Sequence, residues 1–316
     1  MLRYRLTVAA AVATALQMVG GGLVVALNAA HHCGSLGQCL ASGAVLHDAA
    51  AALQVLHRLG AIVVDALVIA VVVGVLRRGR GDRLRLELCL GALALLVAQM
   101  VVGGLMVALR LRSLVTSVAA INGLGLLGAL TALCAVDWHE RHGVQTRVVW
   151  DMARGRLGPA AWPLLVAAGV TAVLDALLRH SGAVEALGGA TRHLAVHAEA
   201  APALATAQVL LLARALSALA LSALAGRFLW RAVHLQRLVV AATVAVGLIP
   251  ADLVTALAPF AGAAPVWPIV AHWVVAALLV AIAVWATTTT ELARPPERAE
   301  RRSGLTLLGR AVANQR

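Results

Sequence analysis

Residues 49–76 read AAAALQVLHRLGAIVVDALVIAVVVGVL, an apolar run that is long enough to cross a lipid bilayer as one helix. A bilayer core of roughly 30 Å needs about 20 mostly apolar residues per helix. Seven more runs have the same character, so the sequence predicts an all-α polytopic membrane protein with eight transmembrane helices. The predicted spans are residues 6–29, 49–76, 86–109, 114–136, 160–178, 196–226, 238–258 and 266–289.

The composition of the whole chain supports this class of protein. Of its 316 residues, 61% are hydrophobic and 13% are charged, whereas soluble domains contain about 45–50% apolar and about 25% charged residues. The net charge of +12 is carried by arginine, since the sequence contains no lysine. An aromatic content of 3% is too low for the base-stacking surfaces of single-strand binders. We therefore expect the lipid bilayer as a partner, and no nucleic acid.

The positions of the arginines predict how the spans are oriented. Basic residues gather at the N-terminus, in the loops 77–85, 141–156 and 227–237, and in the tail after residue 290. The alternate loops hold only Arg110, Arg112, Arg179 and Arg192. Loops rich in positive charge lie on the cytoplasmic side. Both ends of the chain are thus expected in the cytoplasm, with the protein in the plasma membrane of a prokaryote.

The same pattern divides the chain into four parts. Residues 1–136 form a first four-helix half, and the polar segment 137–159 is expected to be a cytoplasmic connecting loop. Residues 160–289 form a second four-helix half, and the arginine-rich residues 290–316 form a cytoplasmic tail. Such a tail is expected to be disordered or to lie on anionic lipid.

One segment of the first span recurs in a central span. Residues 17–27 read QMVGGGLVVAL, and residues 99–109 read QMVVGGLMVAL. This recurrence argues against the alternative that the first span is a cleaved signal peptide. Paired glycines permit close helix–helix approach, so both copies are expected to lie at packing seams.

Four histidines lie inside or at the ends of the predicted spans: His57, His193, His197 and His272. Ionisable groups in membrane helices are costly and usually face the bundle interior, which makes them candidates for function. A satisfied structural histidine is the plainer alternative. Imidazole is a common axial ligand of heme iron. His197 and His272 both lie near the outer ends of their helices, so this pair is predicted to hold one heme, with His193 as the competing choice.

Two cysteines flank a short segment of the first outer loop, Cys33 and Cys39. Disulfides persist outside the cytoplasm, so a bridge between them is the preferred interpretation. The alternative is a copper site in which free thiols bind the metal together with His31 and His32.

These motifs together resemble the heme A synthase family, whose members have eight helices in two homologous four-helix halves. The resemblance covers nearly the whole chain. The matching residues are Gly21-Gly22 followed by Cys33-x5-Cys39, Gln54-Val55-Leu56-His57-Arg58, Gln99 with Gly103-Gly104, the segment around His197, and Pro265-Val266-Trp267 followed by His272.

The resemblance implies a fold of two pseudo-symmetric four-helix bundles and a role for each half. The first half would bind the substrate heme O, held or oriented by His57, with Gln54 at the position of the family's second-helix glutamate. In the second half, His197 and His272 would ligate a heme b that passes electrons. The implied reaction oxidises the heme O methyl group to the formyl group of heme A. Heme O synthase and terminal oxidase subunits are the implied partners.

The chain also departs from the family pattern, mostly in the first half. Gln54 is an amide where the family has a carboxylate, and Asn122 stands in place of the fourth-helix histidine. An amide cannot exchange protons as a carboxylate does. These losses keep a second reading open, in which the protein binds heme without catalysis and serves electron transfer or oxidase assembly. Whether it is an enzyme is left open at this point, although the resemblance favours one.

Three acidic residues lie inside or at the margins of the spans, at Asp65, Asp175 and Asp252. An acid in lipid tends to be protonated or paired, so a buried, hydrogen-bonded structural role is expected for Asp65. Asp65 lies two turns beyond His57, which offers the alternative that it partly replaces the missing carboxylate.

Overall fold

The computed structural model describes residues 2–27, 29, 36–77, 83–108, 113–142, 145–180, 201–234, 238–257 and 266–292. Over these residues the chain is helical and contains no strand, which confirms the all-α prediction. The long helices are α1 (Leu2–Ala26), α4 (Ala49–Leu76), α5 (Arg83–Ala108), α6 (Ser113–His142), α7 (Gln145–His180), α9 (Ala201–His234), α10 (Val239–Leu257) and α11 (Val266–Leu292). Two short helices, α2 (Leu36–Ala41) and α3 (Ala44–His47), precede α4.

Seven of the described helices are long and apolar enough to cross a membrane, so the protein is a multi-pass membrane protein. They are α1, α4, α5, α6, α7, α9 and α11. The seventh predicted span forms α10, but its apolar part, Val239–Thr255, is shorter than the others. Helix length alone therefore gives seven crossings among the described residues, where the sequence predicts eight.

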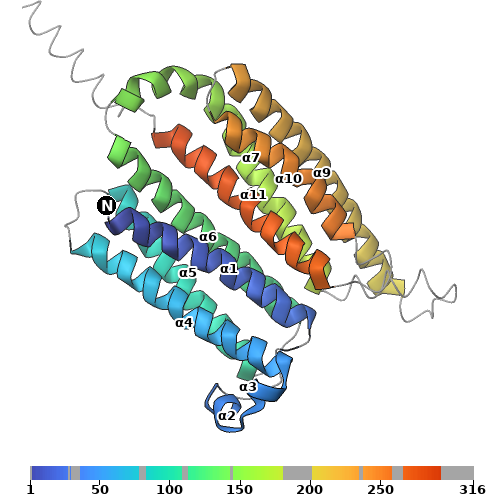
Figure 1. Ribbon diagram of the computed structural model, residues 1–316. Coiled ribbons are helices and arrows are strands. Elements are labelled where there is room, and N and C mark those ends of the chain that lie inside the picture. Colours follow the sequence, from blue (N-terminus) through green and yellow to red (C-terminus); the bar gives the residue numbers. More distant parts are fainter. Residues whose placement is uncertain are drawn as a thin grey trace, which may run out of the picture.

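The long helices pack as two rings of four. In the first ring, α1 packs against α4, α4 against α5, α5 against α6, and α6 against α1. In the second ring, the same closed order runs through α7, α9, α10 and α11. Contacts between the rings come from α6 with α7 and α11, and from α1 with α11 (Figure 1). The N-terminal and C-terminal segments of the chain thus form separate groups of helices that share one interface.

The polar segment between the two rings is helical where the structure describes it. The sequence predicts a connecting loop over residues 137–159, whereas α6 continues to His142 and α7 begins at Gln145. Part of the reason is that a carboxylate near the end of α6 forms ion pairs with arginines of neighbouring helices. Asp137 Oδ1 lies 2.7 Å from Arg3 Nη2 of α1 and 3.1 Å from Arg85 Nη2 of α5.

A second carboxylate completes this charged cluster at the end of the first ring. Glu140 Oε2 lies 2.6 Å from Arg3 Nη2 and 2.7 Å from Arg85 Nη2. Thr7 donates to Asp137 Oδ2 at 3.0 Å. The cluster joins α1, α5 and α6, and it allows a buried carboxylate at Asp137 because each charge has an opposite partner.

Each ring has its own apolar interior. In the first ring it is formed around Val68, Leu96 and Leu130, and in the second ring around Leu221 and Phe228. Large apolar side chains also lie on the outside of the described helices, among them Leu56, Leu212 and Leu219. An apolar outer surface around an apolar interior is expected where lipid, and not water, surrounds the helices.

Candidate functional site

The first candidate site lies where α1 packs against α4 at His57. Gln17 Nε2 of α1 lies 2.9 Å from His57 Nδ1 and donates to the His57 backbone oxygen at 2.8 Å. Gly60 leaves room for this side chain, because a Cβ at that position would collide with Gln17 Oε1. Gln17 therefore fixes the orientation of the imidazole ring.

The glycines that follow Gln17 face the same ring. A Cβ added to Gly21 would lie 3.2 Å from His57 Cε1 and 3.7 Å from Nε2, and one added to Gly20 would lie 3.5 Å from Nδ1. The imidazole ring thus packs directly against α1 at these two glycines. For the first copy of the repeated segment, the predicted packing seam is confirmed.

The third glycine of this segment faces the second ring of helices. A Cβ at Gly22 would overlap the indole of Trp273 on α11, so this indole packs directly against the backbone of α1. Trp273 follows His272 directly, and their rings meet edge to face with centroids 6.1 Å apart. Gly20 and Gly21 therefore contact His57 of the first half, and Gly22 contacts Trp273 of the second half.

The second copy of the segment behaves differently. Asn122 of α6 donates to Gln99 Oε1 at 2.7 Å and to the Leu95 backbone oxygen at 2.8 Å. Gly103 and Gly104 are exposed, and a Cβ on either would meet no atom of the described residues within 4 Å. The packing seam predicted for this copy is wrong, because a glycine pair permits close approach without supplying a partner.

The remaining first-half candidates lie on α4 itself. Gln54 is 3% exposed and lies one turn before His57. Asp65 is half-buried and lies about 12 Å further along the helix axis. The structure thus brings Gln17, and not this acid, to the imidazole ring. Arg58, which follows His57 directly on α4, is the charged residue nearest to it in the sequence.

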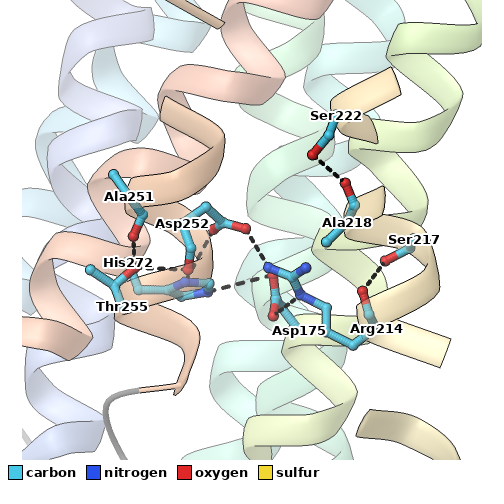
Figure 2. Close-up of polar contacts among 9 residues, drawn as sticks. All are labelled: Asp175, Arg214, Ser217, Ala218, Ser222, Ala251, Asp252, Thr255 and His272. Atoms are coloured by element: carbon cyan, nitrogen blue, oxygen red, sulfur yellow. Dashed lines mark hydrogen bonds and ion pairs between the residues drawn. The ribbon is translucent and has the colours of Figure 1, made fainter. Parts of the chain in front are cut away.

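The second candidate site contains one ionisable side chain from each helix of the second ring (Figure 2). Arg214 of α9 donates from Nε to Asp175 Oδ1 of α7 at 2.5 Å, and from Nη2 to Asp252 Oδ2 of α10. His272 of α11 lies beside both carboxylates. All four residues are at most 4% exposed. Asp175 and Asp252 are thus buried and hydrogen-bonded, whereas Asp65, for which such a role is predicted, is half-buried.

Both ring nitrogens of His272 face an acid. Nδ1 lies 3.3 Å from Asp252 Oδ1, and Nε2 lies 3.8 Å from Asp175 Oδ2. A carboxylate beside one nitrogen is the arrangement in which metal-binding histidines are commonly held. The second carboxylate, however, stands where an iron ligated by Nε2 would lie. The ligation of heme b by His272 stays a prediction, and so does its partner, because His193 and His197 lie outside the described residues.

The first outer loop is described only in part. Cys39 is 2% exposed and packs with Ala51 and Val55 of α4. Cys33, His31 and His32 lie outside the described residues. The Cys33–Cys39 bridge and the alternative copper site therefore both stay predictions.

Sequence reasoning missed Arg214, the residue that joins the two acids of the second site. The signal was available, since a lone arginine in the apolar run 196–226 is costly in lipid and points to a partner inside the bundle. Its partners, Asp175 and Asp252, lie in different helices, so only the fold assigns them to it.

The comparisons with known proteins add no assignment. No protein-family model matches the chain, and no curated protein matches its sequence.

Proposed function

We propose that the protein is a heme A synthase-like membrane oxidoreductase, which takes heme O into its first half and oxidises a methyl group of that heme to formyl for terminal oxidase biogenesis. The observation that carries the proposal is the meeting of two motifs that the resemblance rests on. Gln17, Gly20 and Gly21 of α1 surround the ring of His57 on α4. The sequence separates these residues by more than a helix, and the fold brings them together.

The residues around His57 fit a heme ligand. Metal-binding imidazoles usually have one nitrogen held by a polar partner, and Gln17 contacts Nδ1 in this way. An amide offers both an acceptor and a donor, so Gln17 can serve either ring tautomer. The Cε1 and Nε2 edge lies against Gly21, and Gln17 Nε2 is 3.4 Å from Nε2, so a heme bound to Nε2 would have to displace this amide. A heme bound there would supply the iron that carries electrons or activates oxygen.

A second candidate function is heme binding without catalysis, for electron transfer or oxidase assembly. Two described features favour it. Gln54 places a buried amide one turn before His57, and Asn122 directs its amide nitrogen to Gln99 and Leu95. Neither residue offers the proton exchange or the second imidazole that the family pattern has.

The proposal includes eight crossings with both ends in the cytoplasm of a prokaryote. At 1.5 Å per residue, the 19 residues of α10 extend about 28 Å, close to the roughly 30 Å bilayer core. The arginine-rich loops support this orientation. The second half would hold heme b through His197 and His272, and the partners would be heme O synthase and terminal oxidase subunits.

The test is expression in a host that makes heme O but lacks its own heme A synthase. Pyridine hemochromogen spectra of the purified full chain report bound heme, and extraction reports heme A. We expect His57→Ala to lower heme content and to abolish heme A. The matched control is His234→Ala, which removes an exposed histidine of α9.

The outcomes separate the two candidates. Bound heme without heme A selects the non-catalytic function. Full heme content and full heme A in His57→Ala would overturn the proposed role of His57, and a protein free of heme under all conditions would overturn both candidates.

A further inference from the structure

The last two turns of α9 carry two arginines and a tryptophan on one side of the helix. Arg227 and Trp230 are exposed, and Arg231 is half-buried. Residues three and four positions apart on a helix lie on the same face, so the three side chains are neighbours. We call them the basic face of α9.

The same side of α9 is apolar further from this end. Leu212, Leu216 and Leu219 are each more than half exposed. At about 100° per residue, these leucines lie within about 80° of Arg227 and Trp230 around the helix axis. Exposed leucines on a membrane-spanning helix are suited to contact with lipid acyl chains. One strip of α9 therefore runs from an apolar part to a cationic end.

The length of α9 places the basic face at the level of lipid headgroups. The apolar span in this helix is Ala205–His234, with 30 residues. At 1.5 Å per residue it extends about 45 Å, whereas the bilayer core is roughly 30 Å thick. Residues 205–213 carry no charge, so the excess length lies at the end that contains the arginines. Tryptophan is enriched at this boundary between lipid and water, as is observed here for Trp230.

The arginines at the end of the first ring differ from those of α9 in having acidic partners. Arg3 and Arg85 both form ion pairs with Asp137 and Glu140. Their charges are thus neutralised within the protein. Arg227 forms no ion pair with any described side chain.

The helices around the basic face explain this difference. α9 itself contains no acidic residue. The one acid of α10, Asp252, is bound to Arg214, which lies about 20 Å from Arg227 along the axis of α9. The basic face therefore has an excess of positive charge that an anion from outside the described residues can balance.

We propose that the basic face of α9 binds the headgroup of an anionic phospholipid whose acyl chains lie along the exposed leucines. The lipid phosphate contacts the guanidinium of Arg227, which is suited to bidentate hydrogen bonds with phosphate oxygens. Arg231 adds positive charge one turn away, and the indole of Trp230 packs beside the upper part of the lipid. A phospholipid fits because it has an anionic group and apolar chains at the same two depths as this strip.

This inference goes beyond the proposed function and does not rest on it, because no candidate heme residue takes part. It requires only that α9 crosses the bilayer. Attraction of arginine to anionic lipid is worth about 1 kcal/mol per residue near the membrane surface, which corresponds to about fivefold in affinity.

The test is native mass spectrometry of the purified full chain in detergent, titrated with dioleoyl phosphatidylglycerol or dioleoyl phosphatidylcholine. The two lipids have the same acyl chains and differ in headgroup charge. We expect the wild type to bind phosphatidylglycerol more tightly. Arg227→Gln should weaken that affinity about fivefold, and Trp230→Ala should also weaken it.

The matched control is Arg77→Gln, which removes an exposed arginine that follows α4 in the first ring. It lowers the net charge by the same amount and should leave the affinity for phosphatidylglycerol unchanged. The unfolding temperature of each variant without added lipid verifies that it is folded.

Four results would overturn the proposal. They are equal affinity for the two lipids, wild-type affinity in Arg227→Gln, and an equal loss in Arg77→Gln, which would indicate general attraction to the protein surface. The fourth is displacement of phosphatidylglycerol by an equal concentration of inorganic phosphate, which would indicate an anion site without a role for the acyl chains.

Discussion

Within each ring, a set of four polar side chains can be drawn one from each helix, and the two sets differ in charge and in connection. The first set is Gln17, His57, Gln99 and Asn122, and the second is Asp175, Arg214, Asp252 and His272. The first consists of two separate hydrogen-bonded pairs. The second is one buried network around Arg214. Separate neutral pairs are lost one at a time, whereas a charged network fails as a unit once a partner is removed.

The largest effect is therefore expected from Arg214→Met. The variant leaves two buried carboxylates without their cation, and we expect a loss of about 3–5 kcal/mol in the free energy of unfolding. Thermal or denaturant unfolding in detergent measures it. The variant that combines Arg214→Met with Asp175→Asn and Asp252→Asn removes all three charges and should recover much of the loss. Wild-type stability of Arg214→Met alone would show that the network is not essential.

The second prediction tests whether the first half lacks a carboxylate that the oxidation requires. Gln54→Glu places a carboxylate one turn before His57, where it can accept a proton during oxidation of the heme O methyl group. If the rest of the site is intact, heme A yield should rise by on the order of 10²-fold. Extracted heme is quantified in a host without its own synthase. The control, Gln54→Ala, should leave second-half heme binding unchanged.

A contrary result for Gln54 would be informative in itself. Robust heme A formation by the wild type that Gln54→Ala does not affect would show that this position does not control the chemistry. Attention would then move to Asp65, the half-buried acid further along α4.

The two copies of the repeated segment offer a matched pair of substitutions. Gly22→Ala forces a methyl group into the indole of Trp273, and overpacking of this kind costs about 1–3 kcal/mol. Gly104→Ala adds the same methyl group where an added Cβ meets no atom of the described residues within 4 Å. Its effect on unfolding should lie within about 0.5 kcal/mol of zero. Equal losses in both variants would mean that α1 and α11 do not touch at Gly22.

The smallest expected effect is that of Gln17→Leu. It removes one neutral side-chain partner of His57, for which the loss of stability should be about 1 kcal/mol. Gln99→Leu is the matched control in the second copy. A lower heme content in Gln17→Leu, with no change in Gln99→Leu, would tie the hydrogen bond to His57 to heme binding. If Gln17→Leu lowered the free energy of unfolding as much as Arg214→Met, neutral pairs would not differ from the charged network in their contribution to stability.

Much of the fold follows from the sequence alone. Long apolar runs determine where helices form, and the burial of Asp175 and Asp252 follows from the cost of acids in lipid. The contacts between helices do not follow in the same way. Glycine pairs occur in both copies of the segment, yet only Gly20, Gly21 and Gly22 have partners close by.

The candidate sites, too, follow only in part from the sequence. The choice of His57 and His272 rests on residue type and position within a span. The polar partners of each depend on which helices are neighbours and at what depth they meet. Gln17 and Arg214 lie on other helices than the residues they contact, and pattern reasoning along one span does not reach them.

The contact between Gly22 and Trp273 has a consequence for the order of assembly. It joins α1, the first of the described helices to be synthesised, to α11, the last of them (Figure 1). Chains are made from the N-terminus at about 5–20 residues per second, so α1 is complete long before its partner exists. Until α11 inserts, lipid or another protein must cover the glycine face of α1. The final packing of the first half thus waits until α11 has been synthesised.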